Sequence, residues 1–111
     1  MTIQTQQYGA VTVVKPGGPL TGTDADKFKA RLLEIAGKTL GRVVLDISAV
    51  SYVDSRGLES LVDVTQQLSA SGKALKLCAA NETLRQVMML TGLSSQFEHF
   101  EDANSAIRSF L

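Results

Sequence analysis

The sequence has one cysteine, one histidine, no tryptophan and no excess of charge of either sign. Cys78 cannot form an internal disulfide, and with His99 alone it falls short of the clustered ligands that a structural zinc site needs. Eleven Lys and Arg balance eleven Asp and Glu, so no chain-wide field attracts nucleic acid or an anionic membrane. We therefore expect a reduced protein without metal or cofactor that recognises its partners locally.

Long apolar runs are also missing. No segment approaches the run of about 20 apolar residues that spans a bilayer. The N-terminal MTIQTQQYGA lacks the basic start and apolar centre of a signal peptide. These absences predict a cytoplasmic protein that does not insert into membranes. What is present is a chain of 111 residues, 44% hydrophobic and 20% charged, which is enough to form a single folded domain over residues 1–111.

Short β-branched runs alternate along the chain with segments whose apolar residues recur at helical spacing. The spacing predicts strands over 3–7, 11–14, 42–47, 73–78 and 97–100, and helices over 23–36, 55–70, 81–90 and 102–110. The first strand pairs as an edge with the second, and strands joined by a helix are expected to be parallel. The chain is thus predicted to be an α/β domain with a mixed central sheet of about four to five strands and about four helices.

Local signals refine this pattern. The near-continuous apolar run over 42–47 is typical of a central strand covered on both faces. Pro16 and the glycines after it are expected to end the second strand. Thr23 and Asp26 resemble a capping pair for the first helix. The run over 87–90 is assigned mostly to the core, although Met89 falls off the apolar stripe and is an alternative soft contact for a partner.

The junction between the central strand and the next helix carries the most chemistry. Asp54 suits the N-cap position, where its oxygens accept hydrogen bonds from free amides of the first turn. Ser55 would then begin the helix at an exposed loop tip, where an attached phosphoryl group would meet the positive end of the helix dipole. Gly57 allows the first turn to approach another backbone closely. Ordinary capping and close packing also explain these residues, so local chemistry alone leaves both interpretations open.

A resemblance to a known family rests on four parts of the chain. They are the strand over 43–47, the segment Tyr52-Val53-Asp54-Ser55-Arg56-Gly57-Leu58, the strand over 75–78, and Met89-Leu90-Thr91-Gly92-Leu93 followed by Phe97. In these residues the sequence resembles STAS domains, and within that family the bacterial anti-sigma factor antagonists. The resemblance covers nearly the whole chain in the same order of elements. It implies a STAS-like fold and a protein-binding regulatory switch, not an enzyme.

The resemblance also implies a mechanism for the switch. In such antagonists the serine after the aspartate, here Ser55, is phosphorylated by the anti-sigma factor, itself a serine kinase of the histidine-kinase-like ATPase fold. The unphosphorylated domain would sequester that kinase and free the sigma factor, and a serine phosphatase would restore the binding form. The partner-binding residues implied are Thr21, Asp54, Ser55, Arg56, Gly57 and Leu58. The alternative is an unphosphorylated STAS scaffold subunit in a transporter or signalling complex.

Arg56 departs from the family pattern, because many antagonists carry Ser, Thr or Ala at this position. Its cation can pair with an added phosphate or with a carboxylate on the partner. A hydrolase would need Ser55 and His99 to converge, and Ser55 lacks the Gly-x-Ser-x-Gly surroundings of a nucleophile elbow. His99 is expected instead to be an exposed or hydrogen-bonded strand residue. The glycines near the second strand lack the pattern of a phosphate-binding loop.

Overall fold

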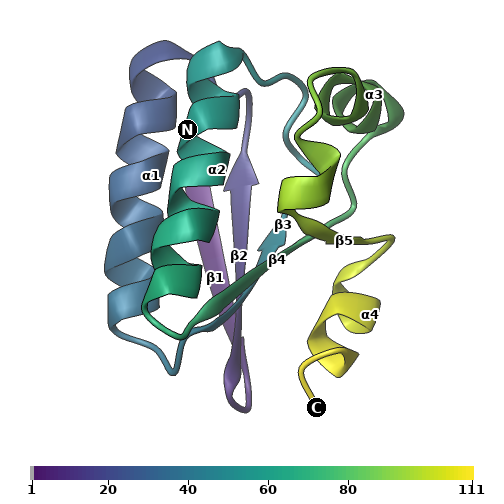
Figure 1. Ribbon diagram of the computed structural model, residues 1–111. Coiled ribbons are helices and arrows are strands. Elements are labelled where there is room, and N and C mark those ends of the chain that lie inside the picture. Colours follow the sequence, from purple (N-terminus) through teal and green to yellow (C-terminus); the bar gives the residue numbers. More distant parts are fainter. Residues whose placement is uncertain (1) are drawn as a thin grey trace.

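The computed structural model describes residues 2–111 (Figure 1). Its elements are β1 (Thr2–Tyr8), β2 (Val11–Gly17), α1 (Gly22–Gly37), β3 (Arg42–Asp46), α2 (Ser55–Ala70), β4 (Ala74–Cys78), α3 (Glu82–Leu90), the 3-10 helix η1 (Ser94–Gln96), β5 (Glu98–Phe100) and α4 (Ala103–Arg108). The predicted alternation of strands and helices is confirmed. The short helix η1 was not predicted.

The strands form one mixed sheet in the order β1-β2-β3-β4-β5. β1 pairs antiparallel with β2, so that Tyr8 lies opposite Val11 across the turn. The remaining neighbours are separated in sequence by helices and pair in parallel, as crossover connections require. The predicted mixed sheet, with β3 at its centre, is confirmed.

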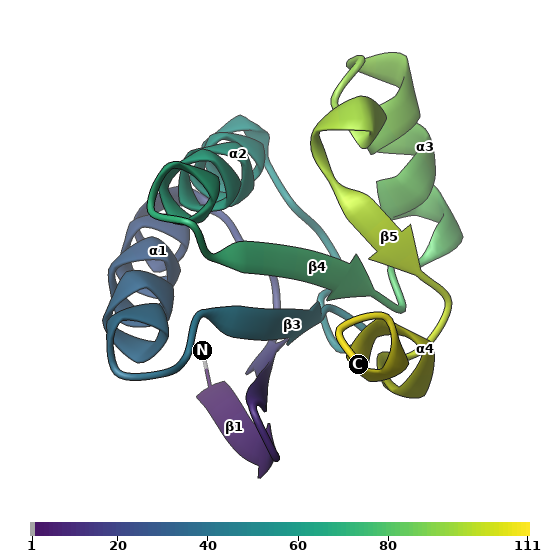
Figure 2. The same cartoon turned by 60° about the horizontal axis from the view of Figure 1, so that its bottom comes forward.

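β3 connects two apolar cores. Val43, Val44 and Leu45 are all fully buried. Val43 and Leu45 belong to the main core beneath α1, α2 and α3, whereas Val44 packs with Cys78 and Ala106 beneath α4 on the opposite face (Figure 2). Because alternate side chains of a strand point to opposite faces, a continuous apolar run is what a strand covered on both faces requires.

The predicted end of β2 is wrong. The strand continues through Pro16 to Gly17, and Pro16 lies opposite Ile3 of β1. β3 pairs with β2 only as far as Val14. Pro16 therefore lies where β2 has a partner on one side only, and such an edge position tolerates the missing N–H of proline.

The predicted start of α1 is also wrong. The helix begins at Gly22, so Thr23 lies inside it, and the N-cap residue is Thr21. The Thr21 side chain makes no capping hydrogen bond. Asp26 does not complete a capping pair either, because its carboxylate pairs with Arg56 of α2.

α2 begins at Ser55 and ends at Ala70, as predicted. The spacing predicts an apolar face of Leu58, Leu61, Val62, Thr65 and Leu68, of which Val62 and Thr65 are only half-buried. The pattern missed the burial of Ser60 and Val64. The buried residues of α2 are Gly57, Leu58, Ser60, Leu61, Val64 and Leu68. The helix therefore begins at the candidate site and is held in place by the main core.

α3 shows where the periodic pattern failed. Asn81 caps the helix as predicted, because its side-chain oxygen accepts a hydrogen bond of 2.8 Å from the N–H of Leu84. Leu84 and Met88 face the core, but Met89 and Leu90 are 64% and 84% exposed. The assignment of Leu90 to the core is wrong, whereas the exposure of Met89 agrees with its position off the apolar stripe. Leu90 is about 200° around the helix from Met88 and so faces away from the core.

Candidate functional site

The loops that follow β2 and β3 meet at one end of the sheet. Val53 and Leu20 form a parallel bridge outside the regular strands. The N–H of Leu20 donates to the carbonyl of Tyr52 at 2.9 Å, and the N–H of Asp54 donates to the carbonyl of Leu20 at 3.3 Å. Both loops leave the carboxyl ends of parallel strands, so the sheet register places them side by side. This backbone pairing brings the start of α1 next to the start of α2.

Asp54 joins the two helices with one carboxylate. Its Oδ1 accepts a hydrogen bond of 2.8 Å from the N–H of Gly57, in the first turn of α2. Its Oδ2 accepts a hydrogen bond of 2.9 Å from the N–H of Gly22, at the start of α1. These two hydrogen bonds hold the pKa of Asp54 below its ordinary value of 3.8. The hydrogen bond from Gly57 has the larger effect. The predicted cap of α2 is confirmed. The hydrogen bond from Gly22 of α1 was not predicted.

Gly57, in the first turn of α2, lies against the backbone of Leu20 in the loop after β2. A Cβ at this position would collide with the carbonyl oxygen of Leu20 and would lie 2.6 Å from Cγ1 of Val53. The close backbone approach that the sequence suggested is therefore present, and a side chain at position 57 would push the loops apart.

Ser55 is exposed at the first position of α2. Within residues 2–111, its hydroxyl forms no hydrogen bond, whereas the neighbouring Asp54 carboxylate is held on both oxygens. An added anion would lie at the positive end of a helix of 16 residues. The hydroxyl is thus free to react with a macromolecular partner without the loss of an internal contact.

The remaining predicted site residues differ in their contacts and in their exposure. The Arg56 guanidinium forms an ion pair with Asp26 of α1, and both side chains are about half exposed. Leu58 is 8% exposed and belongs to the main core. Thr21 is half-buried at the N-cap of α1, adjacent to the glycine that Asp54 binds. Of the six residues that the sequence indicated, Ser55 and Arg56 are exposed, Thr21 and Asp54 are half-buried, and Gly57 and Leu58 are buried.

A shallow groove of about 300 Å³ extends from Ser55 along α2. Its lining residues are Ser55, Leu58, Glu59, Val62, Asp63 and Leu93. Leu93 comes from the turn after α3, far away in sequence, so sequence reasoning did not assign it to the site. Tyr52, in the loop before Ser55, is 60% exposed. Ser55 therefore lies at the edge of a surface with apolar and acidic side chains, which is suited to contact with another protein.

Comparison with known proteins identifies the family. The STAS domain profile matches residues 2–106. The chain belongs to the STAS domain family. BtrV of Bordetella bronchiseptica, named as a candidate anti-sigma factor antagonist, is 29% identical over 93 residues, which are 84% of this chain and 80% of that protein. The anti-sigma-F factor antagonist RsfB of Mycobacterium tuberculosis is 24% identical over 107 residues, 96% of this chain and 87% of that protein.

The fold comparison agrees with the sequence comparison. The crystal structure of a Thermotoga maritima protein, also named as a candidate anti-sigma factor antagonist, superposes with a TM-score of 0.89 at 23% sequence identity. The match covers 96% of this chain and 92% of that one. The STAS-like fold predicted from the sequence is therefore confirmed.

In this STAS domain, Ser55 and His99 do not share a site. His99 lies on β5, where its Nε2 accepts a hydrogen bond of 3.2 Å from the N–H of Ala80. It lines a second cavity whose residues are all different from those of the Ser55 groove. The prediction that His99 is a hydrogen-bonded strand residue is confirmed.

Residues 2–111 contain neither an activated cysteine thiol nor a group of side chains that could hold a metal ion. Burial raises the pKa of the Cys78 thiol to about 12, so the thiol is not activated as a nucleophile. No three His, Cys, Asp or Glu side chains within residues 2–111 form a group that could hold a metal ion. None of the helices in this range has the length and apolar character that crossing a bilayer requires.

Proposed function

We propose that this STAS domain is an anti-sigma factor antagonist controlled by phosphorylation of Ser55. The unphosphorylated domain sequesters an anti-sigma factor that is also a serine kinase of the histidine-kinase-like ATPase fold, and this frees the sigma factor. Phosphorylation of Ser55 releases the anti-sigma factor, and a serine phosphatase restores the binding form. The domain acts in the cytoplasm as a substrate and binding module, not as an enzyme, and neither binds nucleic acid directly nor inserts into a membrane.

The observation that carries this proposal is the exposed Ser55 hydroxyl at the start of α2, at the edge of the groove. A kinase can reach the hydroxyl without unfolding the helix. Side chains of the same partner can contact Leu58, Val62 and Leu93 along the groove. The relatives named as anti-sigma factor antagonists support the same role. Thr21, Asp54, Arg56 and Gly57 complete the proposed binding surface around Ser55.

Phosphorylation would weaken such an interface through charge. The phosphoryl group adds about −1.5 to −2 charges at neutral pH. It would lie beside Asp54, at the end of a groove that already contains Glu59 and Asp63, of which Asp63 is paired with Lys29 at 3.1 Å. A partner surface fitted to a neutral hydroxyl would have to bury this charge without compensation, which costs roughly several kcal/mol. Arg56 is the adjacent cation, and its present partner is Asp26.

The direct experiment combines a kinase assay with a binding titration. The domain is incubated with ATP and a candidate anti-sigma kinase, and mass spectrometry locates the phosphate. The kinase is then titrated with wild type, Ser55→Ala, Ser55→Glu and the control Ser69→Glu, which adds the same charge at the exposed far end of α2. We expect phosphate on Ser55, and binding that is weakened at least about tenfold by Ser55→Glu alone.

A scaffold role would give a different result. If the domain assembles a transporter or signalling complex without phosphorylation, the kinase leaves Ser55 unmodified. Ser55→Glu and Ser55→Ala then bind the partner with equal affinity. Either result would refute the switch, and equal binding without phosphorylation would favour the scaffold.

A further inference from the structure

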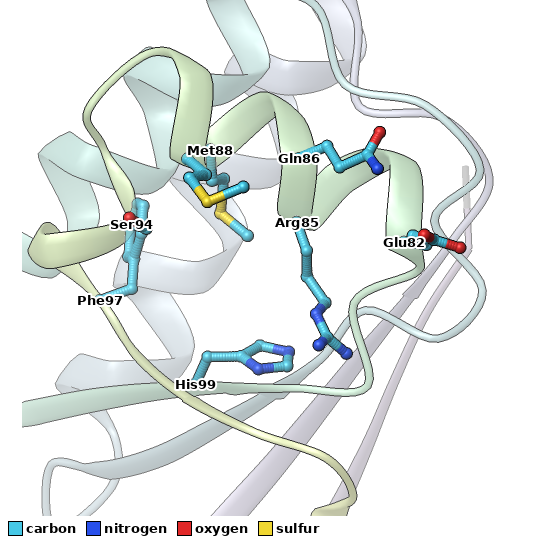
Figure 3. Close-up of a pocket in the computed structure, with 8 residues that line it drawn as sticks. Glu82, Arg85, Gln86, Met88, Ser94, Phe97 and His99 are labelled. Carbon is cyan, nitrogen blue, oxygen red and sulfur yellow. The ribbon is translucent and has the colours of Figure 1, made fainter.

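A second cavity lies between α3, η1 and β5, apart from the Ser55 groove (Figure 3). Its volume is about 390 Å³, which is within the usual range for a small-molecule pocket. Its walls are formed mainly by Glu82, Arg85, Met88, Met89, Phe97 and His99. None of these residues belongs to the proposed phosphorylation site, so the cavity needs a separate explanation.

Arg85 and His99 line this cavity from α3 and β5. The Arg85 side chain extends from α3 toward His99 on β5 (Figure 3). Within residues 2–111, the Arg85 guanidinium has neither an ion pair nor a hydrogen bond. Its planar group of N–H donors is therefore available to a ligand, and this geometry matches a carboxylate.

The hydrogen bond at His99 determines which ring nitrogen carries the proton. Burial of the ring and the positive charge of Arg85 hold the pKa of His99 below its ordinary value of 6.5, and burial has the larger effect. The ring is therefore neutral at pH 7. Nε2 accepts from the N–H of Ala80 at 3.2 Å. The proton therefore lies on Nδ1, which makes no hydrogen bond to residues 2–111 and is left as a donor.

The remaining walls limit the ligand to a single charge and an apolar body. Met88, Met89 and Phe97 provide thioether and aromatic surface, which favours contact with a hydrocarbon or ring. Glu82 adds a carboxylate to the same cavity. Because Glu82 offsets the charge of Arg85 and the His99 ring is neutral, the cavity has no excess positive charge, and this disfavours a doubly charged phosphate more than a singly charged anion.

From this arrangement we propose that the cavity between α3 and β5 binds a small organic monocarboxylate with an apolar body. The Arg85 guanidinium binds the carboxylate oxygens, and the neutral His99 ring lines the same cavity without adding a charge. The apolar part of the ligand lies against Met88 and Phe97. This site is independent of the proposed switch at Ser55, because the two cavities share no lining residue.

The test uses benzoate as the probe and the full chain labelled with ¹⁵N. Benzoate is titrated while the amide signals of residues 82–89 and 97–99 are followed by NMR, with benzamide as the neutral analogue and inorganic phosphate as the competing anion. We expect saturable shifts with benzoate, and shifts from benzamide and phosphate that are at least about tenfold weaker.

Variants assign the binding to Arg85. Arg85→Gln changes an exposed helical side chain and leaves the core intact, and it should weaken benzoate binding by about tenfold or more. Arg85→Lys keeps the charge but loses the planar donors, so its affinity should be intermediate. Arg108→Gln removes the same charge from α4 and should have no effect. The proposal is wrong if benzoate shifts do not saturate, if benzamide or phosphate binds as well, or if Arg85→Gln binds like wild type.

Discussion

Asp54 determines the geometry of the site at the scale of a single residue. One of its oxygens accepts from Gly57 in α2 and the other from Gly22 in α1, so both helix starts depend on the same carboxylate. Ser55 is its neighbour in sequence, and the Ser55 hydroxyl makes no hydrogen bond within residues 2–111. The aspartate thus has a structural role that is separate from any contact it makes with a partner. A substitution at Asp54 is expected to affect stability as well as recognition.

Asp54→Asn should remove a contribution to stability that depends on pH. The pKa of Asp54 in the folded domain is below its ordinary value of 3.8, so the folded state favours the ionised form. Its contribution is complete above the unfolded pKa and is lost as the pH falls through the lower folded pKa. The free energy of unfolding in urea should therefore be higher for wild type than for Asp54→Asn at neutral pH. The two values should converge as the pH falls through the folded pKa of Asp54.

A difference between the two proteins that stays constant as the pH falls from neutral to well below 3.8 would contradict this account. It would mean that the introduced amide group disturbs the loops for steric reasons. The slope of the free energy against urea concentration serves as the control, since an unchanged slope shows that the folded and unfolded states expose the same surface in both proteins.

The elements themselves could be predicted because their signals are local. The apolar stripe of α2 and the continuous run of β3 each lie within one segment, and the structure confirms both. The cap at Asp54 was also local, since its partner Gly57 is three residues away. The sequence therefore indicated the fold and the centre of the site.

Contacts between distant segments could not be predicted in this way. The hydrogen bond from Gly22 to Asp54 joins residues 32 positions apart and depends on the register of β2 against β3. Leu93 reaches the groove beside Ser55 only because α3 packs over the sheet. The exposure of Leu90 depends on which face of α3 meets the core. Each of these features follows from packing between elements, for which a single segment gives no signal.

Gly57→Ala tests how closely the two loops must approach. The added methyl group would collide with the backbone of Leu20, which cannot move aside as a flexible side chain can. We expect a loss of roughly 1–3 kcal/mol in the free energy of unfolding, measured in urea. Gly37→Ala is the matched control, because Gly37 lies in the last turn of α1 and a Cβ there meets nothing within 4 Å.

The control substitution should be neutral or stabilise by up to about 1 kcal/mol, since alanine favours the helical conformation more than glycine does. Equal effects of Gly57→Ala and Gly37→Ala would show that the loops can separate without cost. In that case the close approach of the two loops would not explain why position 57 is a glycine.

At the scale of the whole domain, Ser55 is separated from the two cores that hold the fold together, although Leu58 of the same site belongs to the main core. The main core lies between the sheet and α1, α2 and α3, and the smaller core lies beneath α4. Ser55 lies outside both, at the end of α2 and beyond the carboxyl ends of β2 and β3. A charge can therefore be added at this end of the molecule without entering either core. This separation allows binding to change while the fold is maintained.

Two serines of α2 provide the test of that separation. Ser55 is exposed at the start of the helix, whereas Ser60 is 4% exposed and faces inward. Ser55→Glu adds charge where the helix dipole favours an anion, so its melting temperature should stay within a few degrees of wild type. Ser60→Glu would bury an unpaired carboxylate and should lower the melting temperature sharply or prevent folding. Circular dichroism on heating compares the two variants. If Ser55→Glu unfolds as readily as Ser60→Glu, its loss of partner binding would reflect unfolding, and Ser55 could not act as a switch on an intact domain.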